Sequence, residues 1–154
     1  MKALYLAQID RQLFAVDKER VIGVSSCNSG FFKPIEEGGR RYLPLPYGNR
    51  AMICDVQSLV TGPGGQAPAR QGGHYLIVAA DEELMALAMT GKGRIVTADV
   101  AAARPLPPAF TGPSRMLVPG VLVNGLDLIL LLDLQAVLET TVDRQVECRT
   151  EEKR

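Results

Sequence analysis

The chain has 154 residues, which suits one domain of ordinary size or two small subdomains that share a core. Its 17 basic residues balance its 17 acidic residues, so its charge gives no reason to expect nucleic acid or an anionic membrane as a partner. The three cysteines are widely spaced, and His74 is the only histidine. We therefore expect reduced thiols, no His-based metal site, no Cys–His dyad and no cofactor.

Membrane insertion is not expected from the sequence. The opening stretch "MKALYLAQIDRQ" reaches polar residues too early for a signal peptide. The longest apolar stretch, near residues 128–132, is far shorter than the roughly 20 residues that a membrane-spanning helix needs. The sequence therefore predicts a soluble protein of the cytoplasm.

Short strands separated by turns are predicted in the first half. Two strand patterns flank residues 10–11 as a hairpin, and a further strand follows at 20–24. Residues 27–49 are rich in glycine and proline, so we expect at most short pieces of structure there. Another strand is predicted at 50–56, followed by a flexible glycine-rich connector at 61–73.

The second half repeats this order. A hairpin is predicted around residues 81–83, and a strand follows the Gly-Lys-Gly turn at 91–93, which lacks the helix that a phosphate loop requires. Asn124 and Gly125 give the clearest hairpin signal, because both suit the centre of a type I′ turn. From Leu134 onward, apolar residues recur at helical spacing.

Asp133 stands where the strand pattern changes to the helical pattern. A short carboxylate here can accept a hydrogen bond from a free amide of the first helical turn. No partner acid or base lies near it in the sequence, so a catalytic role is not favoured. The segment "ICDVQSLV" at 53–60 has the same pattern as "LLDLQAVL" at 131–138, which places Asp55 where Asp133 stands. We predict that both aspartates are helix caps.

The starts of the two halves are also similar. The segment "YLAQIDRQLFAV" from Tyr5 aligns with "YLIVAADEELMAL" from Tyr75 if one residue is inserted, which pairs Asp10 with Asp81. Because both similarities occur in the same order, we predict two similar β subdomains. Each half supplies about five short strands, enough for a small barrel of the SH3 or OB kind.

The strand, proline-bearing loop and final hairpin of residues 95–138 resemble the chemotaxis coupling protein family, the CheW-like domain. Residues 5–24 and 50–62 resemble the corresponding parts of that family in outline. The resemblance implies a mainly β fold, with two similar five-stranded barrels that share a hydrophobic core, short helices after each half and a C-terminal helix.

The resemblance also implies the domain organisation and the activity of a divergent family member. It implies a single domain over residues 1–154, with subdomains near 15–75 and 76–133 between which the first strand and last helix can cross. The implied activity is noncatalytic: a cytoplasmic adaptor that docks on the regulatory domain of a chemotaxis-type histidine kinase and on the cytoplasmic tip of a receptor.

One motif differs from the family pattern. The family usually carries "NLRG" just before the strand that ends its first subdomain, and the arginine of this motif is important for function. Counting back from Asp55 places "LPYG" there, so Gly48 matches, while Tyr47 stands where the arginine belongs. Arg50 is a nearby replacement. The resemblance makes Tyr47, Gly48 and Arg50 candidate protein-binding residues, in an adaptor that serves a divergent signalling system.

Two further groups of residues are candidates for partner binding. Phe31 and Phe32 are adjacent aromatics in an irregular loop and cannot both face inward easily, so one is a candidate anchor, with loop packing equally open. Val21, Ile22 and Val24 lie on a strand that the resemblance places near a partner-binding groove. Core packing is the preferred interpretation for at least two of these three, and Val21 and Val24 are kept as candidates.

Other functions remain open at this point. The main alternative is a small-molecule-binding sensory β-barrel domain that uses the cleft between the barrels as its pocket. An OB-like nucleic-acid binder ranks lower, because only 5% of the residues are aromatic and the net charge is zero. A hydrolase ranks last, since one histidine leaves no convincing triad.

Overall fold

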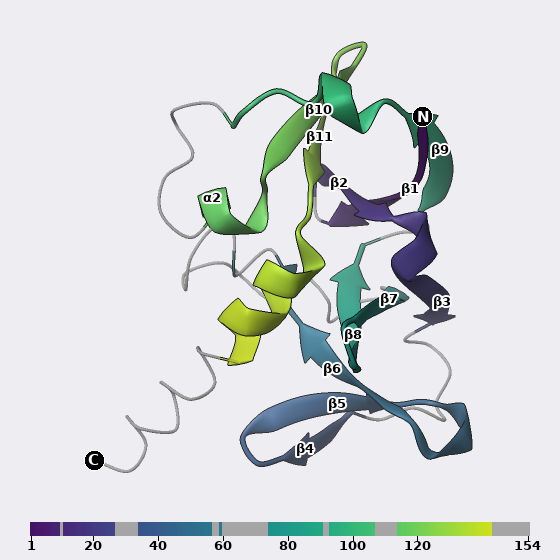
Figure 1. The fold of residues 1–154 in the computed structure, drawn as a ribbon. Coiled ribbons are helices and arrows are strands. Elements are labelled where there is room, and N and C mark those ends of the chain that lie inside the picture. Colours follow the sequence, from purple (N-terminus) through teal and green to yellow (C-terminus); the bar gives the residue numbers. More distant parts are fainter. Residues whose placement is uncertain are drawn as a thin grey trace.

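The strands of the computed structural model form two sheets (Figure 1). The structure describes residues 1–9, 11–26, 34–56, 59, 74–90, 93–106 and 114–142. Sheet A contains, in spatial order, β10 (Gly120–Asn124), β11 (Asp127–Leu131), β2 (Gln12–Asp17), β1 (Lys2–Ile9) and β9 (Arg94–Ala98). Sheet B contains β3 (Val21–Ser26), β7 (His74–Ala80), β8 (Glu83–Met89), β6 (Arg50–Cys54), β5 (Arg40–Pro44) and β4 (Ile35–Glu37).

The two sheets repeat the same arrangement of strands. In sheet A, the β1–β2 hairpin pairs with β9 on one side and, in parallel, with β11 on the other. In sheet B, the β7–β8 hairpin pairs with β3 and, in parallel, with β6. Phe14 lies opposite Leu130 in sheet A, and Met85 lies opposite Met52 in sheet B. The alignment of Asp10 with Asp81 places Phe14 with Met85, and the alignment of Asp55 with Asp133 places Met52 with Leu130. The strand register therefore repeats between the two sheets as the sequence predicts.

Each central hairpin lies in the sheet of the other half. The β1–β2 hairpin precedes β3 in the chain but pairs with strands that follow residue 93, and the β7–β8 hairpin pairs with strands that precede residue 55. The division between the sheets therefore does not follow the expected boundary at residues 75 and 76, which falls inside β7. The resemblance implied that the first strand and the last helix can cross between subdomains, whereas in the structure each central hairpin crosses as a whole.

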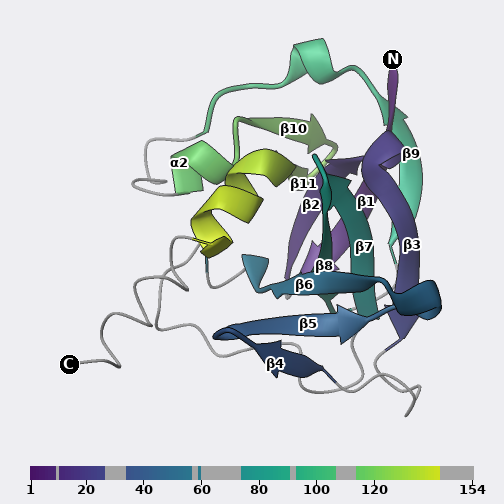
Figure 2. The same cartoon turned by 60° about the horizontal axis from the view of Figure 1, so that its bottom comes forward.

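The central strands of each sheet are buried on both faces, because the sheets share one core and each packs a smaller cluster on its other face. Figure 2 shows the arrangement of these strands. The shared core includes Phe14, Met85 and Cys54, and burial raises the pKa of the Cys54 thiol to about 11. Separate clusters form around Tyr75 in sheet B and around Leu122 in sheet A. The structure thus confirms a mainly β fold of two similar β subdomains with a shared core.

Helices are few and short. They are the 3-10 turns η1 (Lys18–Arg20), η2 (Pro46–Gly48) and η4 (Val100–Ala102), the helix α2 (Ser114–Leu117), and helical residues at 56, 59 and 134–142. The segment 134–142 places Leu134, Val137 and Leu138 in the shared core, as its helical spacing predicts.

Two turns differ from the sequence expectations. The β4–β5 hairpin was not expected within 27–49; it turns at Gly38 and Gly39, which both adopt positive φ (63° and 79°). In the β10–β11 hairpin, Asn124 pairs with Asp127, so the central turn residues are Gly125 and Leu126. Only Gly125 of these two has positive φ, at 65°, and the expected type I′ turn is therefore wrong, although the hairpin is correct.

Candidate protein-binding surface

An apolar groove of about 500 Å³ opens beside β3, at one edge of sheet B. Its walls come from β3 and from the connection between β5 and β6, and its floor comes from β7 and β8. The lining residues are Ile22, Gly23, Val24, Ser25, Leu45, Pro46, Asn49, Ile77 and Leu84. Polar side chains contribute only Ser25 and Asn49, so the groove suits an apolar surface of a partner.

A β-bulge in β3 creates the exposed wall of this groove. Val21 pairs with Val78 and Gly23 pairs with Ile77, so Ile22 is an extra residue between two consecutive partners. Its side chain is 61% exposed, and that of Val24 is 47% exposed. The expectation that at least two of the three β3 side chains pack in the core is wrong. Only Val21 packs against the shared core, and it lies half-buried.

The other wall is the loop that carries the divergent "LPYG" sequence. The amide of Leu45 donates a hydrogen bond to the carbonyl of Asn49 (2.8 Å), which closes the loop around η2. Gly48 has a φ of 79°, a conformation that L side chains rarely adopt, and this explains a glycine there in terms of the backbone. Tyr47 belongs to η2, between two groove-lining residues of this loop, and its side chain lies outside the described part of the structure.

Arg50 follows this loop as the first residue of β6 and is held at the surface by two contacts. Its guanidinium forms an ion pair with the carboxylate of Glu37 and lies 4.0 Å from the centroid of the Tyr42 ring. The ion pair is exposed and contributes little stability, but the ring contact restricts the side chain. Both contacts direct the guanidinium toward β4 and β5, and Arg50 is not among the residues that line the groove.

Asp133 and Asp55 are the two predicted helix caps. Oδ1 of Asp133 accepts hydrogen bonds from the amides of Gln135 (3.1 Å) and Ala136 (3.2 Å), so Asp133 caps the helix that follows it. The carbonyl of Asp55 accepts from the amide of Leu59 (3.2 Å), which repeats the bond from Val137 to Asp133 (3.0 Å). A cap by the Asp55 side chain stays a prediction.

The candidate aromatic anchors Phe31 and Phe32 lie outside the described residues.

A second exposed apolar region lies on sheet A. Ile95 of β9 pairs with Tyr5 as Val24 of β3 pairs with Leu76, so Ile95 and Val24 occupy equivalent places in the repeat. Ile95 is 55% exposed, and β9 and β3 lie on the same side of the molecule in Figures 1 and 2. The β10–β11 hairpin adds three exposed side chains, Val123, Leu126 and Leu128.

Among the residues that the structure describes, no group of three or more His, Cys, Asp or Glu side chains could hold a metal ion. In the same part of the chain, no helix is both long and apolar enough to cross a bilayer. The features assembled around β3 can act by surface contact: an apolar groove, and a bulged strand at the edge of sheet B as far as the described strands show.

Comparison with known proteins identifies the fold. No protein-family model matches the sequence, and no curated protein matches it either. The structure is similar to the crystal structure of the scaffolding protein TtCheW from Thermoanaerobacter tengcongensis, with a TM-score of 0.65. The alignment covers 88% of this chain and 86% of that chain at 16% sequence identity. The chain has a CheW-like fold.

In this CheW-like fold, several groove residues were not found from the sequence, namely Leu45, Pro46, Asn49, Ile77 and Leu84. The floor residues belong to β7 and β8, which meet β3 only through long-range pairing. One local signal was available: Gly23 within an otherwise β-branched strand is typical of a bulge, which would have turned Ile22 outward.

Proposed function

We propose that this chain is a noncatalytic adaptor of chemotaxis-type signal transduction. It couples a receptor or sensor to a histidine kinase, binding the regulatory domain of the kinase and the cytoplasmic tip of the receptor. The observation that carries the proposal is the apolar groove beside β3, in a chain whose fold is CheW-like.

The chemistry of the groove supports recognition of a protein surface. Ile22 and Val24 together offer a continuous apolar strip on an edge strand, where the backbone groups are also open to a partner. Well-packed apolar residues at the centre of such a patch usually carry most of the binding free energy, while polar residues around it exclude water. Ser25 and Asn49 would provide that polar rim.

The η2 loop supports a partner that differs from the usual one. Tyr47 occupies the place of the arginine in the family motif, and Arg50 presents its guanidinium a few residues later, restrained by Tyr42. Because arginine and tyrosine recognise different groups, we expect the kinase and receptor to carry matching changes. The pathway then has its own pair of partners and is not interchangeable with a standard chemotaxis system.

Co-purification with a histidine kinase whose regulatory domain has a related fold tests the proposal. We expect the replacement of Val24 or Ile22 by serine to weaken kinase or receptor binding at least tenfold, because each removes an apolar anchor. Replacement of Tyr47 or Phe32 should also reduce co-purification. The matched control is Val123→Ser, which changes an equally exposed valine on sheet A.

Two results would contradict the proposal. One is full binding by a protein that carries both Ile22→Ser and Val24→Ser. The other is the absence of any kinase or receptor bound to a folded wild-type chain when candidate partners are supplied at high concentration. Turnover of a substrate by the purified chain would contradict its noncatalytic character.

A further inference from the structure

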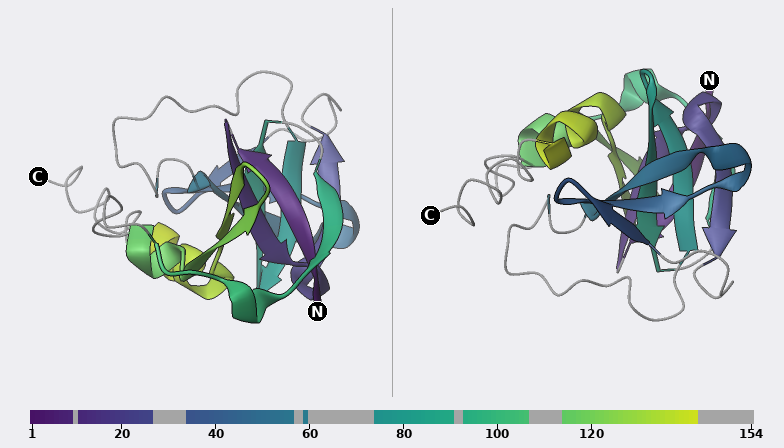
Figure 3. Two further views of the ribbon diagram at one scale, coloured as in Figure 1. Left: turned by 90° about the horizontal axis from the view of Figure 1, so that it is seen from above. Right: turned by 90° about the horizontal axis from the view of Figure 1, so that it is seen from below.

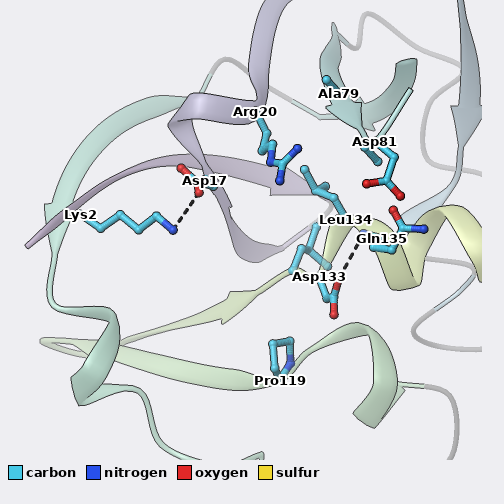
Figure 4. Close-up of a pocket in the computed structure, with 11 residues that line it drawn as sticks. Lys2, Asp17, Arg20, Ala79, Asp81, Pro119, Asp133, Leu134 and Gln135 are labelled. Carbon is cyan, nitrogen blue, oxygen red and sulfur yellow. Dashed lines mark hydrogen bonds and ion pairs between the residues drawn. The ribbon is translucent and has the colours of Figure 1, made fainter. Parts of the chain in front are cut away.

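A second pocket, of about 370 Å³, lies where the two sheets meet. Figure 4 shows its lining, which comes from the start of β1, the end of β2, η1, the turn between β7 and β8, and the start of the helix at 134. The lining residues are Lys2, Asp17, Arg20, Ala79, Ala80, Asp81, Pro119, Leu132, Asp133, Leu134 and Gln135. Unlike the apolar groove beside β3, this pocket combines positive and negative side chains.

At the corresponding place in the other half, two hydrogen bonds join β1 to the residue after β8. Thr90, which follows β8, donates hydrogen bonds to the carbonyl of Gln8 from its amide (2.9 Å) and its hydroxyl (3.1 Å). Gln8 corresponds to Ala79 in the repeat, and Ala79 lines the pocket. The connection between β2 and β3 forms η1 instead; none of its residues is buried, and Arg20 lines the pocket. The seam closed at Gln8 is therefore open at Ala79.

Three charged residues of the lining, Lys2, Asp17 and Asp133, already have partners within the protein. Lys2 Nζ lies 2.8 Å from Asp17 Oδ2, and Asp17 Oδ1 accepts a hydrogen bond from the amide of Glu19. Asp133 uses Oδ1 to cap the helix. The positive charge of Arg20 also acts on Asp17 and helps to lower the pKa of its carboxyl group.

Arg20 and Asp81 are two further lining residues, and their charges are opposite in sign. Neither forms an ion pair with another described residue, although both side chains line the same pocket (Figure 4). Asp81 has a φ of 53°, a conformation that aspartate tolerates better than most residues. A guanidinium binds a carboxylate, and a carboxylate binds an ammonium group, so the pair matches a molecule with both ends.

We propose that this pocket binds a small aliphatic amino acid, with its carboxylate on Arg20 and its ammonium group on Asp81. The pocket volume falls within the range of small-molecule sites. Both charged groups are exposed, so water screens the contacts and we expect weak binding. The ligand would touch both sheets and the η1 connection between them. The proposal does not depend on kinase or receptor binding.

Titration of the full, isotopically labelled chain by NMR tests it. The probes are glycine, β-alanine and γ-aminobutyrate, which separate the two charges by increasing lengths, with acetate and methylammonium as single-charge controls. We expect saturable shifts of the Arg20, Asp81 and Gln135 amides with at least one amino acid, and at least tenfold weaker binding of either control. Added salt should weaken the binding.

Variants decide whether these shifts come from the proposed contacts. Arg20→Gln and Asp81→Asn each remove one charge, and asparagine keeps the backbone conformation at residue 81 accessible. Each should weaken binding at least tenfold, whereas the control Arg41→Gln, at an exposed position of β5, should not. Absence of saturable shifts with all three amino acids, or shifts unchanged in both variants, would overturn the proposal.

Discussion

The strands β9 in sheet A and β3 in sheet B occupy equivalent places beside the central hairpins, but the packing around them differs. On sheet A, the Tyr5 hydroxyl accepts a hydrogen bond from the amide of Gly93 (3.2 Å), and a Cβ built at Gly93 would lie 2.3 Å from the Leu6 carbonyl oxygen. The groove at this edge holds only about 320 Å³. On sheet B, nothing lies within 4 Å of a Cβ built at Gly23, and the groove is larger and apolar.

The outer edges show the same divergence. Sheet B continues past β5 with β4, where Ile35 lies opposite Tyr42. In sheet A, the equivalent position is a single bridge, in which Arg104 and Val121 exchange two hydrogen bonds of 2.8 Å. A common strand order therefore fixes the packing of both halves, while bulges and connections decide which half presents a binding groove. In the right view of Figure 3, the β4–β5 hairpin (blue) lies across the near end of the molecule.

The largest expected effects test the equivalence of the two central hairpins. Phe14→Ala and Met85→Ala both remove a buried side chain from the shared core, at corresponding positions. We expect the free energy of unfolding to fall by about 3–5 kcal/mol for the phenylalanine and about 2–5 kcal/mol for the methionine. Urea denaturation measures both, with the exposed Val123→Ala as control. A negligible cost for either core variant would break the equivalence.

The flanking strands should respond differently to the same substitution. Gly93→Ala forces the new methyl group against Tyr5 and the backbone of Leu6, so we expect a loss of about 1–3 kcal/mol of unfolding free energy. Gly23→Ala meets open space and should change stability by less than about 1 kcal/mol. Thermal or urea unfolding of the two variants gives the comparison. Equal losses would mean that the two edges are equally tight.

Substitution of the two capping aspartates, Asp133 and Asp55, compares the helices that end the two halves. Asp133→Ala removes the acceptor for two helical amides and should cost about 1 kcal/mol, whereas Asp133→Asn should retain most of the stability. A similar cost for Asp55→Ala would extend the predicted cap to the first half. Urea unfolding at neutral pH distinguishes these variants; an unchanged midpoint for Asp133→Ala would rule out the capping role.

The smallest effect concerns the Lys2–Asp17 pair. The hydrogen bond and charge of Asp17 raise the pKa of Lys2; partial burial opposes ionisation of Asp17, but the bonds from Lys2 and Glu19 outweigh it and lower the pKa of Asp17. Stability from Asp17 is therefore present above its ordinary pKa of 3.8 and is lost as the pH falls through its lowered value. Stability from Lys2 is present below 10.5 and is lost as the pH rises through its raised value.

Unfolding of Lys2→Gln and of the unchanged chain across this pH range tests the pair. Because the pair is half-exposed, we expect a difference of less than about 1 kcal/mol at neutral pH, smaller in high salt and absent at both extremes. The control is Lys18→Gln, on the adjacent 3-10 turn, where no ion pair is formed with a described residue. A difference that grows toward acid pH would contradict the sign worked out above.

Local sequence predicted most of the elements and the repeat, and the resemblance to the CheW-like family added the fold of two subdomains with a shared core. Alternating side chains predicted most strands, and the change of period at Asp133 predicted the helix that it caps. The aligned pairs Asp10 with Asp81 and Asp55 with Asp133 also predicted which residues are equivalent, because a repeated pattern of buried positions reflects a repeated sheet. The β4–β5 hairpin was missed, since its charged strands and paired glycines carry no apolar alternation.

Only the tertiary structure decided where each hairpin lies and which surface opens. The two hairpins share a pattern of buried positions, so that pattern alone does not predict which strands each one pairs with. The choice depends on pairing across long stretches of chain, as between Phe14 and Leu130. The groove beside β3 and the pocket beside Ala79 follow from that choice, because each is lined by segments that are distant in sequence and close only in the folded chain.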